Sequence, residues 1–239
     1  MPSIEENLNM WDKEYTWKED GDEWSAAWGG TEYMWQGSIL PRVIRNIPCK
    51  RIVEIACGHG RISQYLLKYC EELILIDISE SCIEHCRKRF AEYGHIKYFV
   101  NDGLSLDMIE DNSVDFVFSW DSLVHAEKNV LKNYLKELSK KMKIKSAGFI
   151  HHSNIGIYIE NESNELTVYN SGWRAEDMTA ADFAGFCFEN ELICKTQEIF
   201  RWSSLAFSDC ISYFYKPLEF DFENEKTIVF KNYNFLNEQ

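Results

Sequence analysis

The chain has 239 residues, a length typical of one domain that buries its own core without disulfides or metal ions. Hydrophobic residues make up 45% of the chain and charged residues 27%, a balance that excludes wholesale disorder. The formal net charge of −14 and the lack of a basic patch argue against a nucleic-acid partner, and no apolar run approaches the roughly 20 residues of a membrane-spanning helix.

The N-terminal segment 1–36 is acidic and aromatic, which is unlike a signal peptide. Five of the eight tryptophans lie in it: Trp11, Trp17, Trp24, Trp28 and Trp35. We expect so aromatic a segment to fold back on the body as a cap. The cap either forms the wall of a pocket, with Trp35 as a candidate substrate contact, or covers an open edge of the core.

Short apolar runs alternate with amphipathic segments from residue 37 onwards. The spacing predicts strands over 51–56, 72–77, 96–101, 114–120 and 147–153. It predicts helices over 37–47, 61–70, 81–90 and 127–142, and Ser81 with Glu84 forms a capping box for the third of these. Strands alternating with helices in this way indicate a doubly wound α/β fold, a parallel sheet with helices on both faces.

The pattern changes after residue 153. Residues 154–177 are polar and loop-like, and we interpret them as an insertion that covers the substrate. Thr179 and Asp182 form a second capping box, which opens a helix within 178–192. The runs 197–202 and 209–216 predict two strands that pair antiparallel, because the segment between them is too short for a crossover helix. The main domain is therefore expected over 37–216, and a C-terminal extension over 217–239 contains one strand-like run, TIVFKNYNF, with no predicted position.

The stretch VEIACGHG, residues 53–60, is the most informative in the sequence. A strand ends with the acid Glu54, small residues follow, and a helix begins at once. Small residues let a ligand approach the backbone closely, and the helix N-terminus offers free N–H groups. A dinucleotide-binding turn would need a third glycine where Ser63 stands, and Glu54 would repel a pyrophosphate. A ligand with a cationic amino-acid end fits better.

This stretch resembles the first motif of the class I S-adenosylmethionine-dependent methyltransferases, with Ala56 where glycine is usual. The resemblance covers about residues 37–216. It implies a seven-stranded, mostly parallel Rossmann-like sheet with an antiparallel last strand, and S-adenosylmethionine as the cofactor. It places the cofactor against the turn, at Glu54, Ala56, Cys57, Gly58, Gly60 and Arg61.

Three later strand ends extend the resemblance. It implies that Asp77 accepts hydrogen bonds from both ribose hydroxyls, as a two-oxygen acceptor can. It also implies that Asp102 with Gly103 lies against the adenine, and that Asp115 is structural. Ile78 and Ser119 complete the expected cofactor contacts.

Methyl transfer to a hydroxyl requires a general base, which we expect at the carboxyl edge of the fourth and fifth strands. Asp121 and His125 follow the fourth strand, and His151 and His152 end the fifth. Neighbours in a strand point to opposite faces, so at most one of this histidine pair faces the pocket. We expect that one to be His152, with Asn154 as its orienting partner.

Each of these candidates has a structural alternative. His125 could instead pack beneath the site, and Asp121 could cap a helical turn. Two histidines and an acid could also bind a metal, but the sequence lacks the acid-rich pair such a site would need, so we expect none.

Trp173 and Arg174 precede the helix at 178–192 and are candidate substrate contacts. Arg174 could clamp a phosphate or carboxylate, or pair with Glu176 or Asp177 at the surface. Asp209 could accept a hydrogen bond from a hydroxyl or simply begin a strand. The segments FIHHSN, WRAEDMTA and DCIS together resemble bacterial sugar and surface-glycan methyltransferases. That likeness implies a hydroxyl acceptor on a carbohydrate-like or phosphorylated glycan precursor.

Other functions are weighed against this one. An aromatic, acidic cap could hold a cation, which would suit an N-methyltransferase of a small amine. A binding module without catalysis and a nicotinamide oxidoreductase are further alternatives. Eight cysteines without C-x-x-C spacing predict reduced thiols and a cytoplasmic protein. The expected partner is a small molecule, not a nucleic acid or membrane, and a homo-oligomer is possible.

Overall fold

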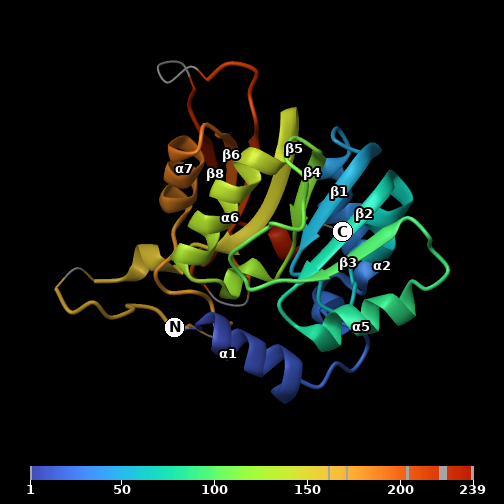
Figure 1. Cartoon of the computed structure of the whole chain (residues 1–239). Helices are drawn as coiled ribbons and strands as arrows, with labels where there is room; N and C mark the ends of the chain where they lie inside the picture. The colour runs from blue at the N-terminus through green and yellow to red at the C-terminus, as the bar shows by residue number, and fades with distance from the viewer. Residues whose placement is uncertain (1, 161, 171, 203–204, 221–224, 238–239) are drawn as a thin grey trace.

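One eight-stranded sheet runs through the computed structural model of the chain, which describes residues 2–160, 162–170, 172–202, 205–220 and 225–237 (Figure 1). The strand order is β3-β2-β1-β4-β5-β7-β6-β8. The strands are β1 (Cys49–Ile55), β2 (Cys70–Asp77), β3 (Ile96–Val100), β4 (Val114–Ser119), β5 (Met142–Ser153), β6 (Ile193–Phe200), β7 (Asp209–Tyr215) and β8 (Ile228–Asn232). β7 runs antiparallel to both β5 and β6, and all other neighbouring pairs are parallel. This confirms the predicted α/β fold.

The expected number of strands was seven, and this was wrong by one. The strand-like run in the C-terminal extension forms β8, which pairs parallel with β6 at the edge of the sheet. The rest of that extension includes residues 221–224 and 238–239, which lie outside the described residues.

The two faces of the sheet are buried by different helices. Alternate residues of a strand point to opposite faces, so Ile52 and Val53 of β1 enter different core clusters. The first cluster is covered by α4 (Ser63–Leu66), α5 (Glu80–Arg89) and a continuous helical run made of α2 (Thr31–Met34), η3 (Trp35–Ile39) and α3 (Leu40–Val43). The second is covered by α6 (Lys128–Lys141) and α7 (Ala180–Glu189).

Local capping decides where two of these helices begin. Thr179 and Asp182 form the expected reciprocal capping box of α7. The expected box of Ser81 and Glu84 was wrong, because the hydroxyl of Ser79 accepts the Cys82 N–H and starts α5 two residues earlier. The helix expected over 61–70 is brief: α4 passes into η4 (Leu67–Tyr69), and β2 begins at Cys70.

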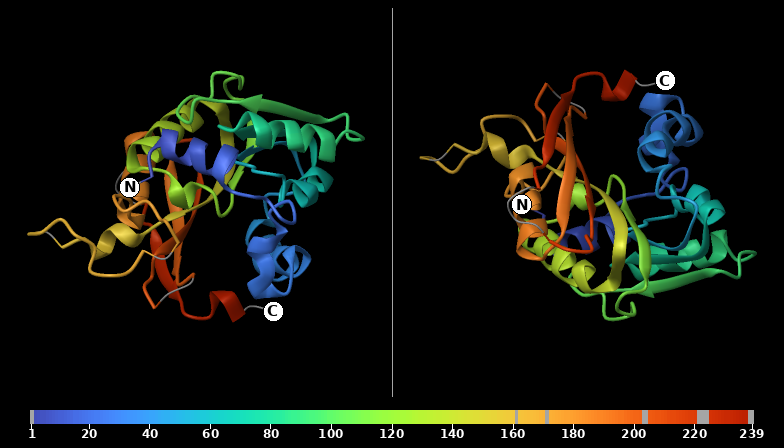
Figure 2. Two further views of the ribbon diagram at one scale, coloured as in Figure 1. Left: turned by 90° about the horizontal axis from the view of Figure 1, so that it is seen from below. Right: turned by 90° about the horizontal axis from the view of Figure 1, so that it is seen from above.

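The cap, described over residues 2–36, divides into two parts with different roles. Its first part consists of α1 (Ile4–Asn9), η1 (Met10–Glu14) and η2 (Asp22–Trp28), and α1 crosses one edge of the sheet (Figure 2). The second part begins with Trp28, the last residue of η2. Trp28 and Trp35 are both buried in the first core cluster, and Trp35 stacks on Tyr65. Trp35 is therefore a core residue and not the substrate contact that we expected.

The short helical turns η5 (Leu123–His125), η6 (Ile155–Tyr158) and η7 (Phe235–Asn237) complete the described elements. Within the described ranges, no helix has the length and apolar character needed to cross a membrane.

Candidate functional site

A cavity of about 520 Å³ lies where β1, β2 and β4 end and the cap crosses them. This volume falls in the range of about 300–1,000 Å³ usual for small-molecule sites. The sheet side of the wall comes from the ends of these central strands and the turns that follow them, and the cap side is mainly aromatic: Trp11, Tyr15, Trp17 and Trp24. In a parallel sheet this edge is where ligands bind.

The glycine turn follows β1 and forms one end of the cavity. Ala56, Gly58 and Gly60 all have positive φ, of 58°, 54° and 82°. A Cβ atom on Gly60 would lie 2.5 Å from the ring of Phe90, so this glycine allows α5 to pack on the turn and does not line the cavity. Ala56, Cys57 and Gly58 do line it.

Glu54 lies in the cavity wall but is only 4% exposed. The Ser63 hydroxyl donates to Oε2 at 2.5 Å and is the only hydrogen-bond partner of this carboxyl among the described residues. Burial raises the pKa of Glu54 to about 8, against the weaker opposing effect of Ser63. A ligand that brings a positive charge into the cavity would relieve this cost.

Asp77 lies at the end of the neighbouring strand. Its carboxylate accepts the Gly58 N–H at 2.9 Å and the Ser79 N–H at 3.0 Å, and it also borders the cavity. Burial raises its pKa, although these backbone donors oppose the shift. A diol at this position would supply the further hydrogen bonds that a buried carboxylate needs.

The third strand end differs from the expectation. Asp102 is exposed and outside the cavity wall, and its carboxylate accepts the N–H groups of Leu104 and Ser105 at 2.8 and 2.7 Å. These bonds lower its pKa. The structure therefore gives Asp102 the role of a turn residue, and Asn101 lines the cavity in its place.

Some of the other expected cofactor contacts line the cavity and others do not. Ile78, Gly103 and Arg61 border the cavity. Ser119 does not: it is fully buried, and its hydroxyl has no hydrogen-bond partner among the described residues. Asp115 is structural as expected, because it accepts the Arg51 N–H at 2.9 Å near the start of β1.

His152 faces away from the cavity. Its ring stacks on Phe183 of α7 at 4.5 Å, and Nε2 pairs with the Ser212 hydroxyl at 2.8 Å. Burial lowers its pKa to about 3. The assignment of His152 as the catalytic base was therefore wrong. Its expected partner Asn154 is equally structural, because it bonds the backbone of Phe207 and Ala180.

His151 occupies the cavity side of β5, behind the wall. Its Nδ1 accepts the backbone N–H of Asp121 at 3.2 Å, so Nε2 carries the proton and donates to Asp209 at 2.9 Å. Both ring nitrogens are thereby engaged, and the ring is fully buried. His151 positions its neighbours and has no free lone pair.

Two arginines near the cavity are paired with these acids. Arg61 donates to Asp121 at 2.9 Å. Arg174 donates to Asp209 through Nε at 3.0 Å and lies 4.0 Å from Asp121. Burial alone would raise the pKa of Asp209, but the Arg174 charge and the His151 hydrogen bond lower it well below its usual range. The partner of Arg174 is thus neither Glu176 nor Asp177 but a buried carboxylate.

His125 is the histidine among the candidate bases that lines the cavity, which His59 of the glycine turn also borders. Its Nδ1 donates to the Trp173 carbonyl at 2.8 Å, and its ring packs beside those of Trp11 and Trp173, with centroids 5.3 and 5.6 Å away. This hydrogen bond leaves a lone pair on Nε2, which has no partner among the described residues. Burial, followed by the charge of Arg174, lowers the pKa of His125 to about 4. The ring therefore stays neutral at neutral pH, and its Nε2 is available as a weakly basic proton acceptor.

Several wall residues had no signal in the sequence. Trp120 and Trp202 line the cavity, and Tyr134 reaches it from α6. An aromatic residue at helical or strand spacing predicts core burial as readily as a pocket, so nothing distinguished these three.

Comparison with known proteins agrees with this geometry. Residues 52–145, from β1 into β5, match the family model described as a methyltransferase domain. The chain is 31% identical over 114 residues to phosphoethanolamine N-methyltransferase 1 of Caenorhabditis elegans, a match that covers 46% of this chain and 23% of that protein. It is 26% identical over 81 residues to ribosomal RNA small subunit methyltransferase A of Coxiella burnetii, covering 33% of this chain and 31% of that protein. The matches thus span 23% and 31% of the length of these two relatives.

Solved structures share the fold over more of the chain. Geranyl diphosphate C-methyltransferase from Streptomyces coelicolor, crystallised with S-adenosyl-L-homocysteine, superposes with a TM-score of 0.67 at 12% identity, covering 90% of this chain and 98% of that one. A SAM-dependent methyltransferase from Methanosarcina mazei gives a TM-score of 0.59 at 15% identity, covering 75% and 98%.

Residues 52–145 thus match a methyltransferase domain, and the solved methyltransferases share the expected Rossmann-like fold. S-adenosylmethionine, the expected cofactor, is the group that the cavity fits: Glu54 offers an uncompensated carboxyl to its ammonium, and Asp77 offers acceptors to its ribose. The names of these proteins indicate different kinds of methyl acceptor, so the comparisons leave the acceptor of this chain open.

Proposed function

We propose that this protein is a methyltransferase that moves the methyl group of S-adenosylmethionine to a hydroxyl of a small, uncharged, carbohydrate-like acceptor. His125 is the general base in this proposal. The match of residues 52–145 to a methyltransferase domain supports the reaction class. The tautomer and position of His125 support the hydroxyl.

The cofactor supplies a methyl group already activated on a sulfonium, so the chain has to orient the acceptor and remove one proton. Glu54 and Asp77 lie at the ends of adjacent strands and fix the cofactor at its amino-acid and ribose ends. The cap forms one side of the cavity and so limits the contact of the reacting groups with water.

His125 carries the proposal. A hydroxyl is weakly acidic, so a positioned base contributes about 10²- to 10⁴-fold to its methylation. The Trp173 carbonyl holds the His125 proton on Nδ1 and leaves Nε2 to accept the proton of the acceptor. The neighbouring Asp121 is already bonded to Arg61 and is less suited to this role.

The charge balance of the cavity supports an uncharged acceptor. Arg61 pairs with Asp121 and Arg174 with Asp209, so the positive charge of both arginines is largely balanced, which favours an uncharged acceptor over a phosphorylated one. Aromatic rings suit the apolar faces of a sugar, and they line the cap side of the cavity.

The experiment is to assay S-adenosylhomocysteine release against a panel of uncharged sugars, sugar phosphates and amines. With a hydroxyl acceptor, His125→Ala is expected to lower kcat by about 10²- to 10⁴-fold and to change the Kd for S-adenosylhomocysteine by less than about twofold. His95→Ala is the matched control, because His95 bonds the Leu67 carbonyl and lies outside the cavity wall.

The pH dependence gives an independent test. Since the base must be unprotonated, kcat measured at saturating S-adenosylmethionine and acceptor falls only as the pH falls through the His125 pKa of about 4. The wild-type profile is therefore expected to stay flat from about pH 8 down to about pH 5.5, where an ordinary histidine with a pKa near 6.5 would already be protonated. An unchanged rate for His125→Ala would refute the assignment.

N-methylation of a small amine is the second candidate. Trp11, Trp17 and Trp24 with Asp121 could surround a cation, and one relative is named as a phosphoethanolamine N-methyltransferase. Turnover of an amine but of no sugar, with His125→Ala still active, would favour this candidate over the first.

A further inference from the structure

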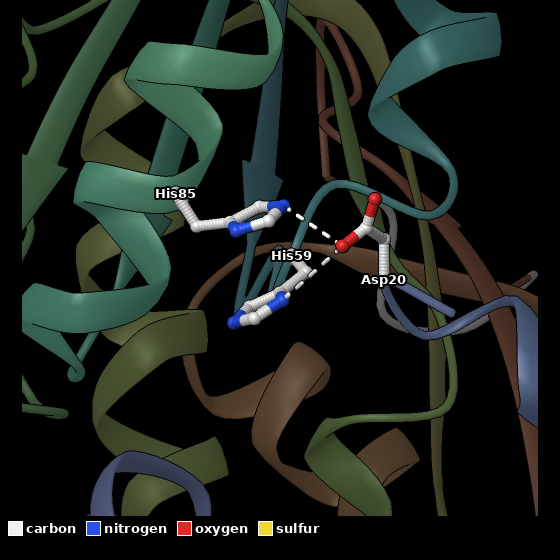
Figure 3. Close-up of side chains that lie close together, drawn as sticks. All are labelled: Asp20, His59 and His85. Carbon is white, nitrogen blue, oxygen red and sulfur yellow. Dashed lines mark ion pairs between the residues drawn. The ribbon is translucent and has the colours of Figure 1, made fainter. Parts of the chain in front are cut away.

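Three side chains gather where the cap, the glycine turn and α5 meet (Figure 3). One of them, His59, borders the cavity, and the other two lie outside its wall. They are Asp20 of the cap, His59 of the turn and His85 of α5, and one ligand-type atom from each lies within 4.8 Å of the other two. The proposed methyl transfer makes no use of this cluster.

The geometry directs both histidines at the same carboxylate oxygen. Asp20 Oδ1 lies 3.1 Å from His85 Nε2 and 3.9 Å from His59 Nδ1. The two rings stack with centroids 3.9 Å apart and planes within 8°, so both present a nitrogen to Asp20 from the same side (Figure 3). His59 Nδ1 is buried and has no hydrogen-bond partner among the described residues. A buried nitrogen without a partner requires a physical explanation, and a bound cation is one.

Neighbouring contacts fix the cluster in place. Trp17 stacks on His59 at 4.2 Å with planes within 15°. Arg89 donates to the carbonyl oxygens of both Asp20, at 3.4 Å, and His59, at 2.9 Å. The backbones that carry two of the three side chains are thus joined before any ligand binds.

We propose that Asp20, His59 and His85 bind a divalent transition metal of the zinc type, with water completing the coordination. Two neutral imidazoles and a carboxylate are a ligand set that zinc takes when one position stays open, whereas magnesium and calcium prefer oxygen ligands alone. Zinc bonds of about 2.0–2.2 Å separate ligand atoms by about 3.4 Å, so the cluster has to contract by roughly 1 Å through small rotations of its side chains. All three residues are partly exposed, which leaves a path for the ion and its water.

The metal would fasten the cap over the cavity. Asp20 lies close in sequence to Trp17, a wall residue, and His59 follows Gly58, whose N–H donates to Asp77. One ion would therefore join the cap to the turn that holds the cofactor. This coupling rests on the proposed function, whereas metal binding itself does not.

The test is a calorimetric titration of the full chain, freed of metal by a chelator, with zinc chloride. Wild-type protein is expected to bind one equivalent, and His59→Ala and His85→Ala are each expected to raise the Kd at least tenfold. His95→Ala is the matched control and should bind as wild type does. Since the His85 side chain is about one-third exposed, its variant should fold normally, which thermal melting without metal verifies.

Cobalt(II) serves as a spectroscopic probe, because the chain has eight free cysteines that also bind soft metals. The proposal requires a cobalt spectrum without a thiolate charge-transfer band. Equal binding by wild type and both histidine variants, a thiolate band, or no binding of either metal would overturn the site.

A second titration tests the coupling with S-adenosylhomocysteine in the presence and absence of zinc. Wild type should bind it several-fold more tightly with zinc, and His85→Ala should show no difference. If zinc binds at the cluster but leaves this affinity unchanged, the metal site stands and its action on the cap is refuted. If S-adenosylhomocysteine fails to bind under any condition, the proposed function fails while the zinc result is still decided by the histidine variants.

Discussion

Glu54→Gln is expected to change the pH dependence of stability and to weaken cofactor binding at the same time. Burial raises the pKa of Glu54 from 4.5 to about 8 in the folded protein. Between these two pH values the folded protein holds a proton on Glu54 that the unfolded chain has lost. The free energy of unfolding therefore falls as the pH rises through this window, and the cost is complete above about pH 8.

The size of the effect follows from the two pKa values. A carboxyl with values of 4.5 and about 8 costs the wild-type protein roughly 3 kcal/mol of stability between about pH 5 and about pH 7.5. Glutamine has no such titration. The glutamine amide nitrogen, placed next to Ser63, would have no hydrogen-bond acceptor, which lowers the free energy of unfolding by about 1–3 kcal/mol at every pH. The change of the free energy of unfolding with pH is therefore a cleaner measure than its absolute value.

Urea unfolding of ligand-free protein at several pH values measures this slope. The difference in stability between Glu54→Gln and wild type should shift in favour of the variant by roughly 3 kcal/mol from about pH 5 to about pH 7.5. The control is Glu71→Gln, the same substitution on an exposed side chain, which should run parallel to wild type. If the free energy of unfolding of Glu54→Gln depends on pH in the same way as that of wild type, burial does not destabilise the ionised Glu54 carboxylate and the reasoning is refuted.

The same variant tests the cofactor contact. A hydrogen bond to a charged group contributes about 1.5–3 kcal/mol, so Glu54→Gln should raise the Kd for S-adenosylhomocysteine by about 10- to 100-fold. Saturating S-adenosylhomocysteine should also remove the wild-type pH slope, because the bound ammonium stabilises the ionised carboxylate. Calorimetry that shows equal affinities would remove Glu54 from the cofactor site.

Three further substitutions separate binding roles from structural ones. Asp77→Asn should raise the Kd for S-adenosylhomocysteine at least about tenfold in calorimetry, because the ribose hydroxyls lose an acceptor; an unchanged Kd would show that the ribose lies elsewhere. Asp102→Ala should leave this Kd within about twofold, since its carboxylate bonds its own turn; a large loss would restore the adenine contact that the sequence suggested. Asp209→Asn leaves the buried Arg174 without its counter-charge and should lower the free energy of unfolding by about 3–5 kcal/mol in urea; a loss below about 1 kcal/mol would contradict the importance of this pair.

The parallel core of the fold could be predicted because its signal is local. Strands buried on both faces read as short apolar runs, and β1, β2 and β4 each show one before a turn. β8 shows the limit of such signals. Its residues 228–230 are exposed, so it presents no core-facing alternation, and its position is set by backbone pairing with β6. A strand of this kind is recognisable in the sequence, but its partner is not.

The histidine pair shows why the site was only partly predictable. Alternation along β5 correctly placed His151 and His152 on opposite faces of the sheet. It could not tell which face was which, because both faces of this sheet are buried and each offers polar partners. The prediction that Asp102 contacts the adenine was wrong for a related reason. An acid after a strand is equally able to bind a ligand and to accept the N–H groups of its own turn, and only the folded backbone distinguishes the two.

The position of the cap affects both the hydration of Glu54 and the access of ligands to the cavity. Asp12 of the cap accepts hydrogen bonds of 2.6 Å from the hydroxyls of both Ser79 and Ser81, beside Asp77, and Arg61 donates to Ser25 at 3.2 Å. The cavity wall comes from both the cap and the sheet, so a movement of the cap would change the access of solvent and cofactor to Glu54. Opening the cap would hydrate Glu54 and relieve its desolvation, whereas a bound ammonium compensates Glu54 only while the cavity stays closed. The buried carboxyl thus opposes closure in the empty protein and favours it in the occupied one.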